Sequence, residues 1–171
     1  HSAGFEAYIV GGSVRDAVMG VVPHDFDITT SALPQETVQI FTEKGYKVIE
    51  TGLKHGTVTV LCEHEPVEIT TFRVDGAYAD ARHPENVRFT AKLSEDLKRR
   101  DFTVNALVYA SQCGVIDLFD GLSDIQNKTL RCIGNPNERF SEDALRILRA
   151  LRFSAKLDFS VEPETAEAAV A

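Results

Sequence analysis

The segment EAYIVGGSVRDAVMGVVPHDFDITT, residues 6–30, is the stretch that decides the fold and the kind of site this chain carries. Its first five residues, 6–10, have the apolar composition of a buried strand, and this strand runs directly into Gly11 and Gly12. Residues 13–20 then predict a short helix. A glycine pair at a helix start offers bare backbone N–H groups and the positive end of a helix dipole, which suit an anionic phosphate group. The segment lacks the Gly-Lys-Ser/Thr of a Walker loop.

Two carboxylates follow in a second strand, predicted over residues 25–30 by alternation. Side chains two residues apart on a strand point to the same face, so Asp25 and Asp27 lie side by side. Like charges this close raise each other's pKa unless a cation lies between them. Oxygen ligands of this kind favour Mg²⁺, which completes its shell with phosphate oxygens and water. Two-ion phosphoryl chemistry would use a third carboxylate, and Glu68 is the candidate.

Each part of this pattern also has an ordinary structural explanation. An Asp-x-Asp pair is often a solvated strand edge, a Gly-Gly pair is often only a turn, and Glu68 can be a surface residue of a half-exposed strand. The glycine turn and the carboxylate pair together, between strand, helix and strand, indicate a site for a triphosphate and a metal ion.

The rest of the chain alternates between strand-like and helix-like segments. Further helices are predicted at 34–41, 93–107, 142–156 and 163–171, and Ser31, Ser94 and Ser141 are the expected capping residues of the first three. Further strands are predicted at 46–50, 57–62, 66–72, 107–110, 115–118 and 130–133. Loops are predicted at 75–86 and around Pro136. This order predicts an α/β (α+β) fold, a mixed sheet with helices packed on one face.

Composition narrows the class of protein. The 171 residues, 43% hydrophobic and 26% charged, suit one soluble domain or one domain and the start of another. No run of 18 apolar residues and no secretory leader is visible, so we expect no membrane span. Three scattered cysteines suit a reducing, cytoplasmic location. The net charge of −8 argues against a surface that grips nucleic acid throughout, but leaves room for a local basic site.

Five motifs, in order, resemble those of class II tRNA nucleotidyltransferases, and bacterial poly(A) polymerases share most of them. They are GGSVRD (11–16), DFD (25–27), KRRDFTVNAL (98–107), VIDLFDG (115–121) and ERFSEDALRILRALRFSAKLDF (138–159). The resemblance implies a polymerase-beta-like catalytic head at residues 1–140 and the truncated start of a helical neck at 141–171. It also implies Mg²⁺-dependent addition of CMP and AMP, from CTP and ATP, to the 3′ end of tRNA. Most tRNA contacts would belong to domains that this chain lacks.

The resemblance also implies roles by position. Asp25 and Asp27 match the metal ligands, Asp101 matches the carboxylate that recognises the ribose 2′-hydroxyl, and Asn105 lies where the family contacts the triphosphate. The other candidate nucleotide-binding residues are Gly11, Gly12, Arg15, Arg100, Asp143, Arg146, Arg149 and Arg152. Arg149 and Arg152 continue the spacing of Arg146, and we expect one of the two to be only a solvated or structural charge.

Asp143 and Arg146 match the pair that reads the incoming base, and their chemistry suits that role. Three residues apart on the predicted helix, they share a face. Asp accepts from a base amino group, and Arg donates to ring acceptors. The same pair can also be a surface ion pair.

Alternatives stay open within and outside this class. Residues 75–90 resemble the flexible loop that CCA-adding members use to switch from C to A addition, although an ordinary surface loop has the same composition. The activity can instead be that of a poly(A) polymerase or of a partial, CC- or A-adding enzyme. A non-catalytic nucleotide- or tRNA-binding module is the alternative of another class, and the clustered carboxylates Asp25, Asp27 and Asp101 argue against it.

Overall fold

A mixed β-sheet forms the centre of the molecule. The computed structural model describes residues 2–63, 65–76 and 87–170. Within these, the sheet has the strand order β3-β4-β5-β2-β1-β8-β9. The strands are β1 (Ala7–Val10), β2 (Asp27–Thr30), β3 (Lys47–Ile49), β4 (Thr57–Cys62), β5 (Glu65–Thr71), β8 (Val108–Ala110) and β9 (Gly114–Ile116). β2 and β5 pair in parallel and every other pair is antiparallel, so the predicted mixed sheet is confirmed.

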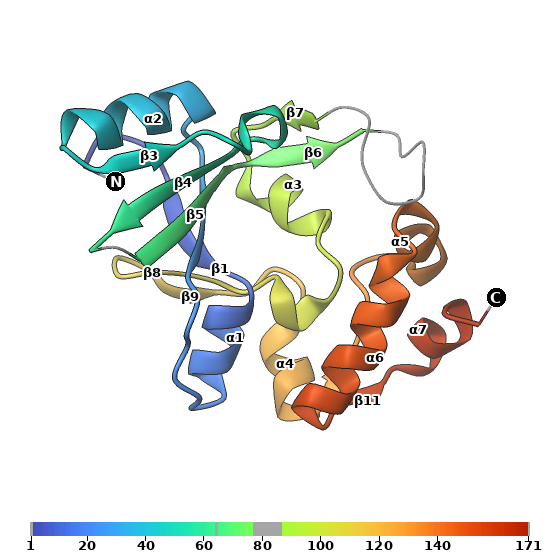
Figure 1. Ribbon diagram of the computed structural model, residues 1–171. Coiled ribbons are helices and arrows are strands. Elements are labelled where there is room, and N and C mark those ends of the chain that lie inside the picture. The colour runs from blue at the N-terminus through green and yellow to red at the C-terminus, as the bar shows by residue number, and fades with distance from the viewer. Residues whose placement is uncertain (1, 64, 77–86, 171) are drawn as a thin grey trace.

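The helices flank this sheet in two groups. They are α1 (Gly12–Val18), α2 (Pro34–Glu43), α3 (Leu93–Lys98), α4 (Gly121–Gln126), α5 (Pro136–Glu142), α6 (Leu145–Leu157) and α7 (Pro163–Ala168). Figure 1 shows α2 beside the β3 end of the sheet, whereas α5, α6 and α7 gather on the opposite side of the molecule. Two small pairs complete the fold: β6 (Arg73–Asp75) with β7 (Val87–Phe89), and β10 (Thr129–Leu130) with β11 (Ser160–Val161). No helix of the described segments is long and apolar enough to cross a membrane.

The turn from β1 into α1 depends on Gly11. Its φ of +81° lies in the left-handed region that favours glycine. Its N–H donates to the Leu107 carbonyl at 3.0 Å, which joins the turn to the segment before β8. The predicted strand–glycine–helix unit is therefore present, and the turn at its centre is held between β1, α1 and the segment before β8.

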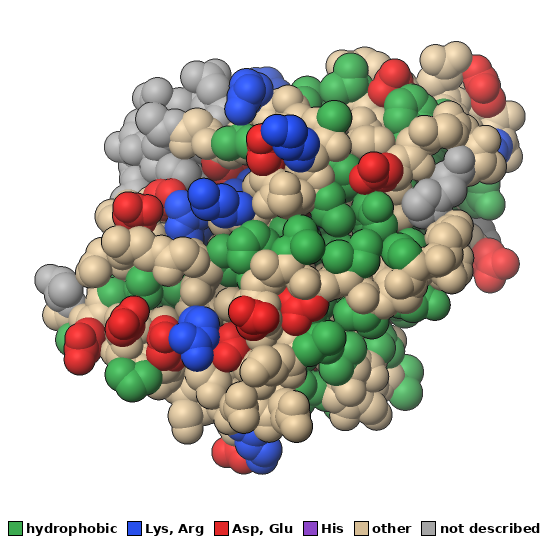
Figure 2. Space-filling model, turned by 180° about the vertical axis from the view of Figure 1, so that it is seen from behind, with side chains coloured by type: hydrophobic (Ala, Val, Ile, Leu, Met, Phe, Trp, Pro, Cys, Tyr) green, Lys and Arg blue, Asp and Glu red, His purple; other side chains and the backbone are tan. Residues whose placement is uncertain are grey.

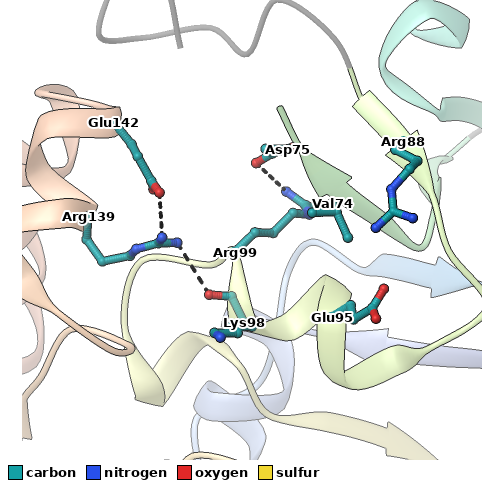
Figure 3. Close-up of a pocket in the computed structure, with 8 residues that line it drawn as sticks. All are labelled: Val74, Asp75, Arg88, Glu95, Lys98, Arg99, Arg139 and Glu142. Atoms are coloured by element: carbon teal, nitrogen blue, oxygen red, sulfur yellow. Dashed lines mark hydrogen bonds and ion pairs between the residues drawn. The ribbon is translucent and has the colours of Figure 1, made fainter. Parts of the chain in front are cut away.

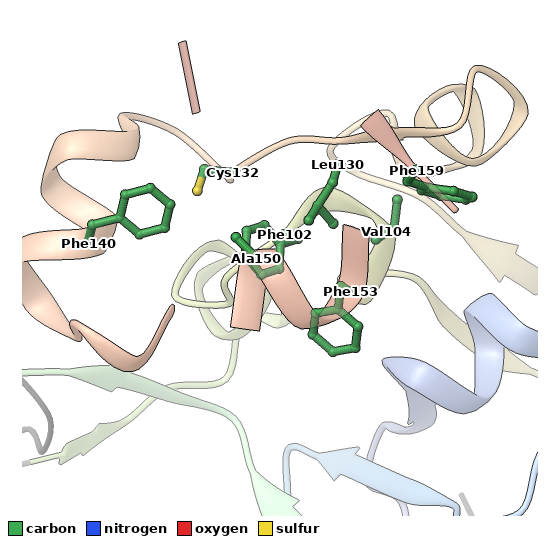
Figure 4. Packing of buried hydrophobic residues seen from close by; sticks show 8 residues of the cluster. All are labelled: Phe102, Val104, Leu130, Cys132, Phe140, Ala150, Phe153 and Phe159. Atoms are coloured by element: carbon green, nitrogen blue, oxygen red, sulfur yellow. The ribbon is translucent and has the colours of Figure 1, made fainter. Parts of the chain in front are cut away.

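A hydrophobic cluster joins α6 to the middle of the chain (Figure 4). Its members are Phe102, Val104, Leu130, Cys132, Phe140, Ala150, Phe153 and Phe159. The rings of Phe102 and Phe153 pack edge to face with centroids 6.0 Å apart. The segment after α3 is thus buried against α6, and this contact brings the two most arginine-rich motifs together.

The helix predicted over 93–107 is wrong in length, and Ser94 does not cap it. α3 begins after Lys92 and ends at Lys98, and a 3₁₀ turn follows at Thr103–Asn105. Between them Phe102 is extended, with φ −124° and ψ 148°. The Asp101 carboxylate accepts the Phe102 N–H at 2.8 Å, a local bond that competes with the helical one.

The helix predicted over 142–156 is also wrong at its start. Asp143 is extended, and α6 begins at Leu145, whose N–H donates to the Asp143 carboxylate at 2.9 Å. Asp143 therefore lies between the two helices, at the C-cap of α5, and its side chain accepts the first N–H of α6. Pro136, predicted in a loop, begins α5.

Two smaller predictions change as well. Leu33, and not Ser31, is the N-cap residue of α2. β6 and β7 lie in or beside the stretch predicted as a loop, of which residues 77–86 are outside the described residues.

Candidate active site

A cavity of about 320 Å³ collects side chains from four separate segments: the β1–α1 turn, the start of β2, the segment after α3, and α6. Ten of the residues predicted from the sequence line it: Gly11, Gly12, Arg15, Asp25, Asp27, Arg100, Asp101, Asn105, Arg149 and Arg152. Glu68, Asp143 and Arg146 do not. The cavity also includes five residues that the sequence interpretation did not name as site residues: Ser13, Asp16, His24, Phe153 and Lys156.

Asp25 and Asp27 both face this cavity, although only Asp27 belongs to the strand. β2 begins at Asp27, so Asp25 lies in the preceding loop and the predicted strand alternation does not apply to it. Burial raises the pKa of Asp27, the nearby Arg100 guanidinium lowers it, and Asp25 raises it further. Two carboxylates at one cavity are the donor set that Mg²⁺ binds together with phosphate oxygens. The residues present therefore fit a divalent cation.

Glu68 lies beside Asp27 in the sheet, paired with it in register on β5. It is exposed and does not line the cavity. Among the residues that the structure describes, no group of three or more His, Cys, Asp or Glu side chains could hold a metal ion. A third carboxylate at Glu68 stays a prediction from the sequence.

Arg100 supplies the positive charge opposite the carboxylates. Burial lowers the pKa of its guanidinium, and Asp96 and Asp101 counteract this. Its Nη2 lies 3.6 Å from the Asp96 carboxylate, while its buried Nε has no hydrogen-bond partner among the described residues. A Cβ at Gly11 would lie 3.5 Å from the Arg100 Nη1, so this guanidinium lies against the glycine turn. The turn and the arginine together form a cationic wall.

Arg15 and Asn105 brace each other inside the cavity. The Arg15 Nη1 donates to the Asn105 side-chain oxygen at 2.6 Å, and its Nε and Nη2 donate to Asp16 at 2.8 and 2.6 Å. Arg15 is only 2% exposed. Its donors are thus directed largely at protein groups, and it ties α1 to the turn at Thr103–Asn105.

Asp101 connects the centre of the molecule to α6. One carboxylate oxygen accepts from the Phe102 N–H and from the Asn105 amide at 3.2 Å. The other oxygen accepts from both the Nε and the Nη2 of Arg149, at 2.7 and 2.6 Å, in a charge-assisted ion pair. Asp101 therefore lies between the carboxylate side of the cavity and the arginines of α6.

Comparison with known proteins identifies the family. A profile of the Poly A polymerase head domain matches residues 7–131. The chain belongs to this family. The sequence resemblance is thereby confirmed, and nucleotidyltransferases of this polymerase-beta type generally depend on a divalent metal ion.

Within this family, the chain is similar to CCA-adding enzymes. A CCA-adding enzyme of Streptococcus suis (strain 05ZYH33) is 56% identical over 169 residues, which are 99% of this chain and 41% of the relative. One of Enterococcus faecalis (strain ATCC 700802 / V583) is 53% identical over 165 residues, 96% of this chain and 40% of the relative. The crystal structure of the Bacillus stearothermophilus CCA-adding enzyme in complex with CTP matches with a TM-score of 0.87 at 42% identity, covering 98% of this chain and 39% of that chain. The chain spans about two fifths of the length of these relatives.

In this head-domain chain, Phe153 also lines the cavity, although the sequence interpretation did not name it as a site residue. Three guanidinium groups lie over its ring, those of Arg15 and Arg149 at 5.3 Å and that of Arg152 at 5.9 Å. Cations are attracted to the face of an aromatic ring. The position of Phe153 next to Arg152, and four residues after Arg149, was the available signal.

Asp143 and Arg146 are separated by the break between α5 and α6 and do not share a helix face as predicted. Arg146 is 7% exposed; its Nη1 donates to Glu142 at 2.7 Å and its Nη2 to the Arg99 carbonyl at 3.1 Å. Its guanidinium is thus directed at protein groups. Base reading by this pair stays a prediction.

A second cavity, of about 340 Å³, lies between β6, α3 and α5 (Figure 3). Two ion pairs lie in it: Arg139 donates to Glu142 at 2.5 Å, and Arg99 lies 3.7 Å from Asp75. Its lining residues include neither the aspartate pair nor the glycine turn, so the cavity at Asp25 and Asp27 is the better candidate for chemistry.

Proposed function

We propose that this chain is the catalytic head of a CCA-adding tRNA nucleotidyltransferase, with the head at residues 1–140 and the start of the neck at 141–171. The observation that carries the proposal is the cavity in which Asp25 and Asp27 oppose Arg100 and the glycine turn. The names of the relatives support the choice of substrates: CTP is bound in one structure, and a primer tRNA with an ATP analogue in another, at 32% identity and a TM-score of 0.76. The proposed site of action is the cytoplasm.

The proposed reaction joins the tRNA 3′-hydroxyl oxygen to the α-phosphorus of CTP or ATP while the bond to pyrophosphate breaks. Asp25 and Asp27 would hold Mg²⁺, which when bound neutralises negative charge on the phosphates. Arg100 and the N–H groups at Gly11 and Gly12 stabilise the triphosphate by electrostatics that need no rearrangement. No protein nucleophile is required, because the attacking group belongs to the tRNA.

The rest of the cavity selects the nucleotide in this proposal. Asp101 accepts a hydrogen bond from the ribose 2′-hydroxyl, which favours ribonucleotides. Asn105 orients Arg15 next to the triphosphate. Arg146 is aimed at Glu142 and the Arg99 carbonyl, so base reading requires it to exchange these partners for the base.

Most tRNA contacts are proposed to lie in segments that the relatives have beyond this chain. On the face shown in Figure 2, Lys and Arg side chains are scattered among Asp, Glu and hydrophobic side chains, with no continuous basic surface. Polyanion binding depends on many phosphate contacts by Lys and Arg. The chain alone should therefore bind nucleotides better than tRNA.

The test uses two measurements. Calorimetry on the 171-residue chain with Mg²⁺ should show binding of CTP and ATP, and the protein extended to the length of its relatives should add C, C and A to a tRNA that lacks them. Addition of A alone would favour a poly(A) polymerase or an A-adding enzyme, and addition of C alone a CC-adding one. Nucleotide binding without any incorporation would favour the non-catalytic module.

A further inference from the structure

Asp96, in α3, is a fully buried carboxylate that does not line the cavity. Its Oδ1 accepts from the Arg73 backbone N–H at 3.2 Å and from the Arg99 Nε at 3.0 Å. Its Oδ2 accepts from the Thr29 hydroxyl at 3.0 Å and lies 3.6 Å from the Arg100 Nη2. A buried charge persists only when it is paired and hydrogen-bonded, and this one has partners on both oxygens.

The partners of Asp96 belong to the site described above. Thr29 lies on β2 two residues after Asp27, so its hydroxyl comes from the strand that carries a proposed metal ligand. Arg100 lines the cavity. The carbonyl of Arg99 accepts from Arg146, which belongs to α6. The Asp96 carboxylate thus contacts β2 through Thr29, the cavity through Arg100, and Arg99, whose carbonyl accepts from Arg146.

Arg100 needs such an anchor. A free arginine side chain samples many rotamers, and this freedom must be lost for its guanidinium to occupy one place. The ion pair with Asp96 lies on the Nη2 side at 3.6 Å, and Nη1 lies against Gly11. Within the part of the chain that the structure describes, the Nε has no hydrogen-bond partner. Burial raises the pKa of Asp96, but the charges of Arg99 and Arg100 and the hydrogen bonds from Arg99 and Thr29 together bring it below its ordinary value. The carboxylate is therefore ionised where it faces Arg100.

We propose that Asp96 is a positioning residue for nucleotide binding, because it holds the Arg100 guanidinium toward the phosphate side of the cavity. This inference rests on the proposed function, in which Arg100 contacts the triphosphate. Asp96 touches no ligand itself, and its effect on the nucleotide passes through Arg100.

A double-mutant cycle tests this chain of action. The dissociation constant of CTP with Mg²⁺ is measured by calorimetry for the wild-type chain, Asp96→Asn, Arg100→Met and the double variant. Asp96→Asn and Arg100→Met are each expected to weaken binding about tenfold, and the double variant no more than Arg100→Met alone, since the two act as one unit. Additive losses would overturn the inference, because Asp96 would then act by another route.

A matched control separates positioning from stability. Asp124 is also buried, at 4% exposure, and its carboxylate accepts from Thr103 at 2.6 Å and from Arg131 at 3.2 Å. It does not line the cavity. Asp124→Asn should lower the melting temperature without changing the CTP dissociation constant. An equal weakening of CTP binding in this variant would assign both effects to stability and overturn the inference.

Thr29→Val provides a milder variant if Asp96→Asn does not fold. It removes the donor that fixes the Asp96 oxygen beside Arg100, and it should weaken CTP binding about threefold only while Arg100 is present. Unchanged binding, or a loss that persists in the Arg100→Met background, would contradict the inference. If the wild-type chain itself binds neither CTP nor ATP, the proposed function fails and this inference with it, a result distinct from the loss of coupling alone.

Discussion

Replacing Asp101 by Asn should separate the structural from the recognition role of this carboxylate. Asn keeps one oxygen for the Phe102 N–H but presents its amide, a donor, to the donors of Arg149. Two charge-assisted bonds of 2.6 and 2.7 Å are lost. Hydrogen bonds to charged groups contribute roughly 1.5–3 kcal/mol, and solvent screens this one because the Arg149 side chain is 46% exposed. We expect the free energy of unfolding to fall by about 2 kcal/mol.

Two assays follow from that number. Thermal unfolding should shift down by about 4–8 °C, given roughly 2–4 °C per kcal/mol for a chain of this size. In calorimetry, the preference for CTP over dCTP should shrink, because the acceptor proposed for the 2′-hydroxyl has changed.

Arg149→Met is the matched control for Asp101. It removes the same ion pair but leaves the Asp101 carboxylate, so stability should fall by a similar amount while the preference for CTP over dCTP is kept. If Asp101→Asn discriminates between CTP and dCTP as well as the wild type does, the ribose role is refuted. If Asp101→Asn and Arg149→Met lose the preference for CTP over dCTP equally, the ion pair, and not the carboxylate alone, determines that preference.

Three further outcomes follow from the same structure. Asp25→Ala should reduce kcat of the extended protein by more than tenfold, or about 1.4 kcal/mol; smaller losses would refute the metal-ligand role. Because burial and Asp25 raise the pKa of Asp27, the folded state binds this proton more tightly than the unfolded state, so stability should fall as pH rises above the ordinary value of 3.8 toward the raised one. In Asp27→Asn, the free energy of unfolding, measured by denaturation at a series of pH values, should no longer fall with pH in this range. An unchanged dependence on pH would contradict the raised pKa of Asp27. Leu148 and Leu151 are 61% and 62% exposed on α6, so changing both to Lys should reduce self-association in light scattering with little change in melting temperature. Unchanged association would show that this apolar face does not mediate it.

The local fold around the glycine turn could be predicted because its signals are short-range. A strand, a glycine at positive φ and a helix follow one another within residues 7–18, and each depends on its own neighbours. Asp25 and Asp27 face one cavity even though the strand begins only at Asp27. The prediction of a shared strand face is therefore wrong, because Asp25 precedes the strand, although both side chains line the cavity.

The helix boundaries could not be predicted from apolar spacing, because side-chain hydrogen bonds decide them. Asp101 and Asp143 each bond a backbone N–H one or two residues later, and each stands at the break in a predicted helix. Periodicity does not register such bonds. Asp143 and Arg146 consequently lie on different elements, although the motif places them three residues apart.

The surroundings of Asp96 and Phe153 could not be predicted from the sequence either. Asp96 reads as an exposed acid near a helix start, and only the packing of α3 against β2 shows that it is buried beside Thr29. Phe153 likewise reads as core, and its three arginine neighbours come from α1 and α6. Contacts between segments far apart in the chain decide both roles.

The division between head and neck at residues 140 and 141 follows the motifs, but it is not a boundary in the packing. The cluster of Figure 4 combines Phe102 and Val104 with Ala150 and Phe153 in one core. The ion pair of Asp101 with Arg149 crosses the same boundary. α6 therefore contributes side chains to the candidate active site from across the proposed division, and Asp101 on the other side of it holds Arg149 in place.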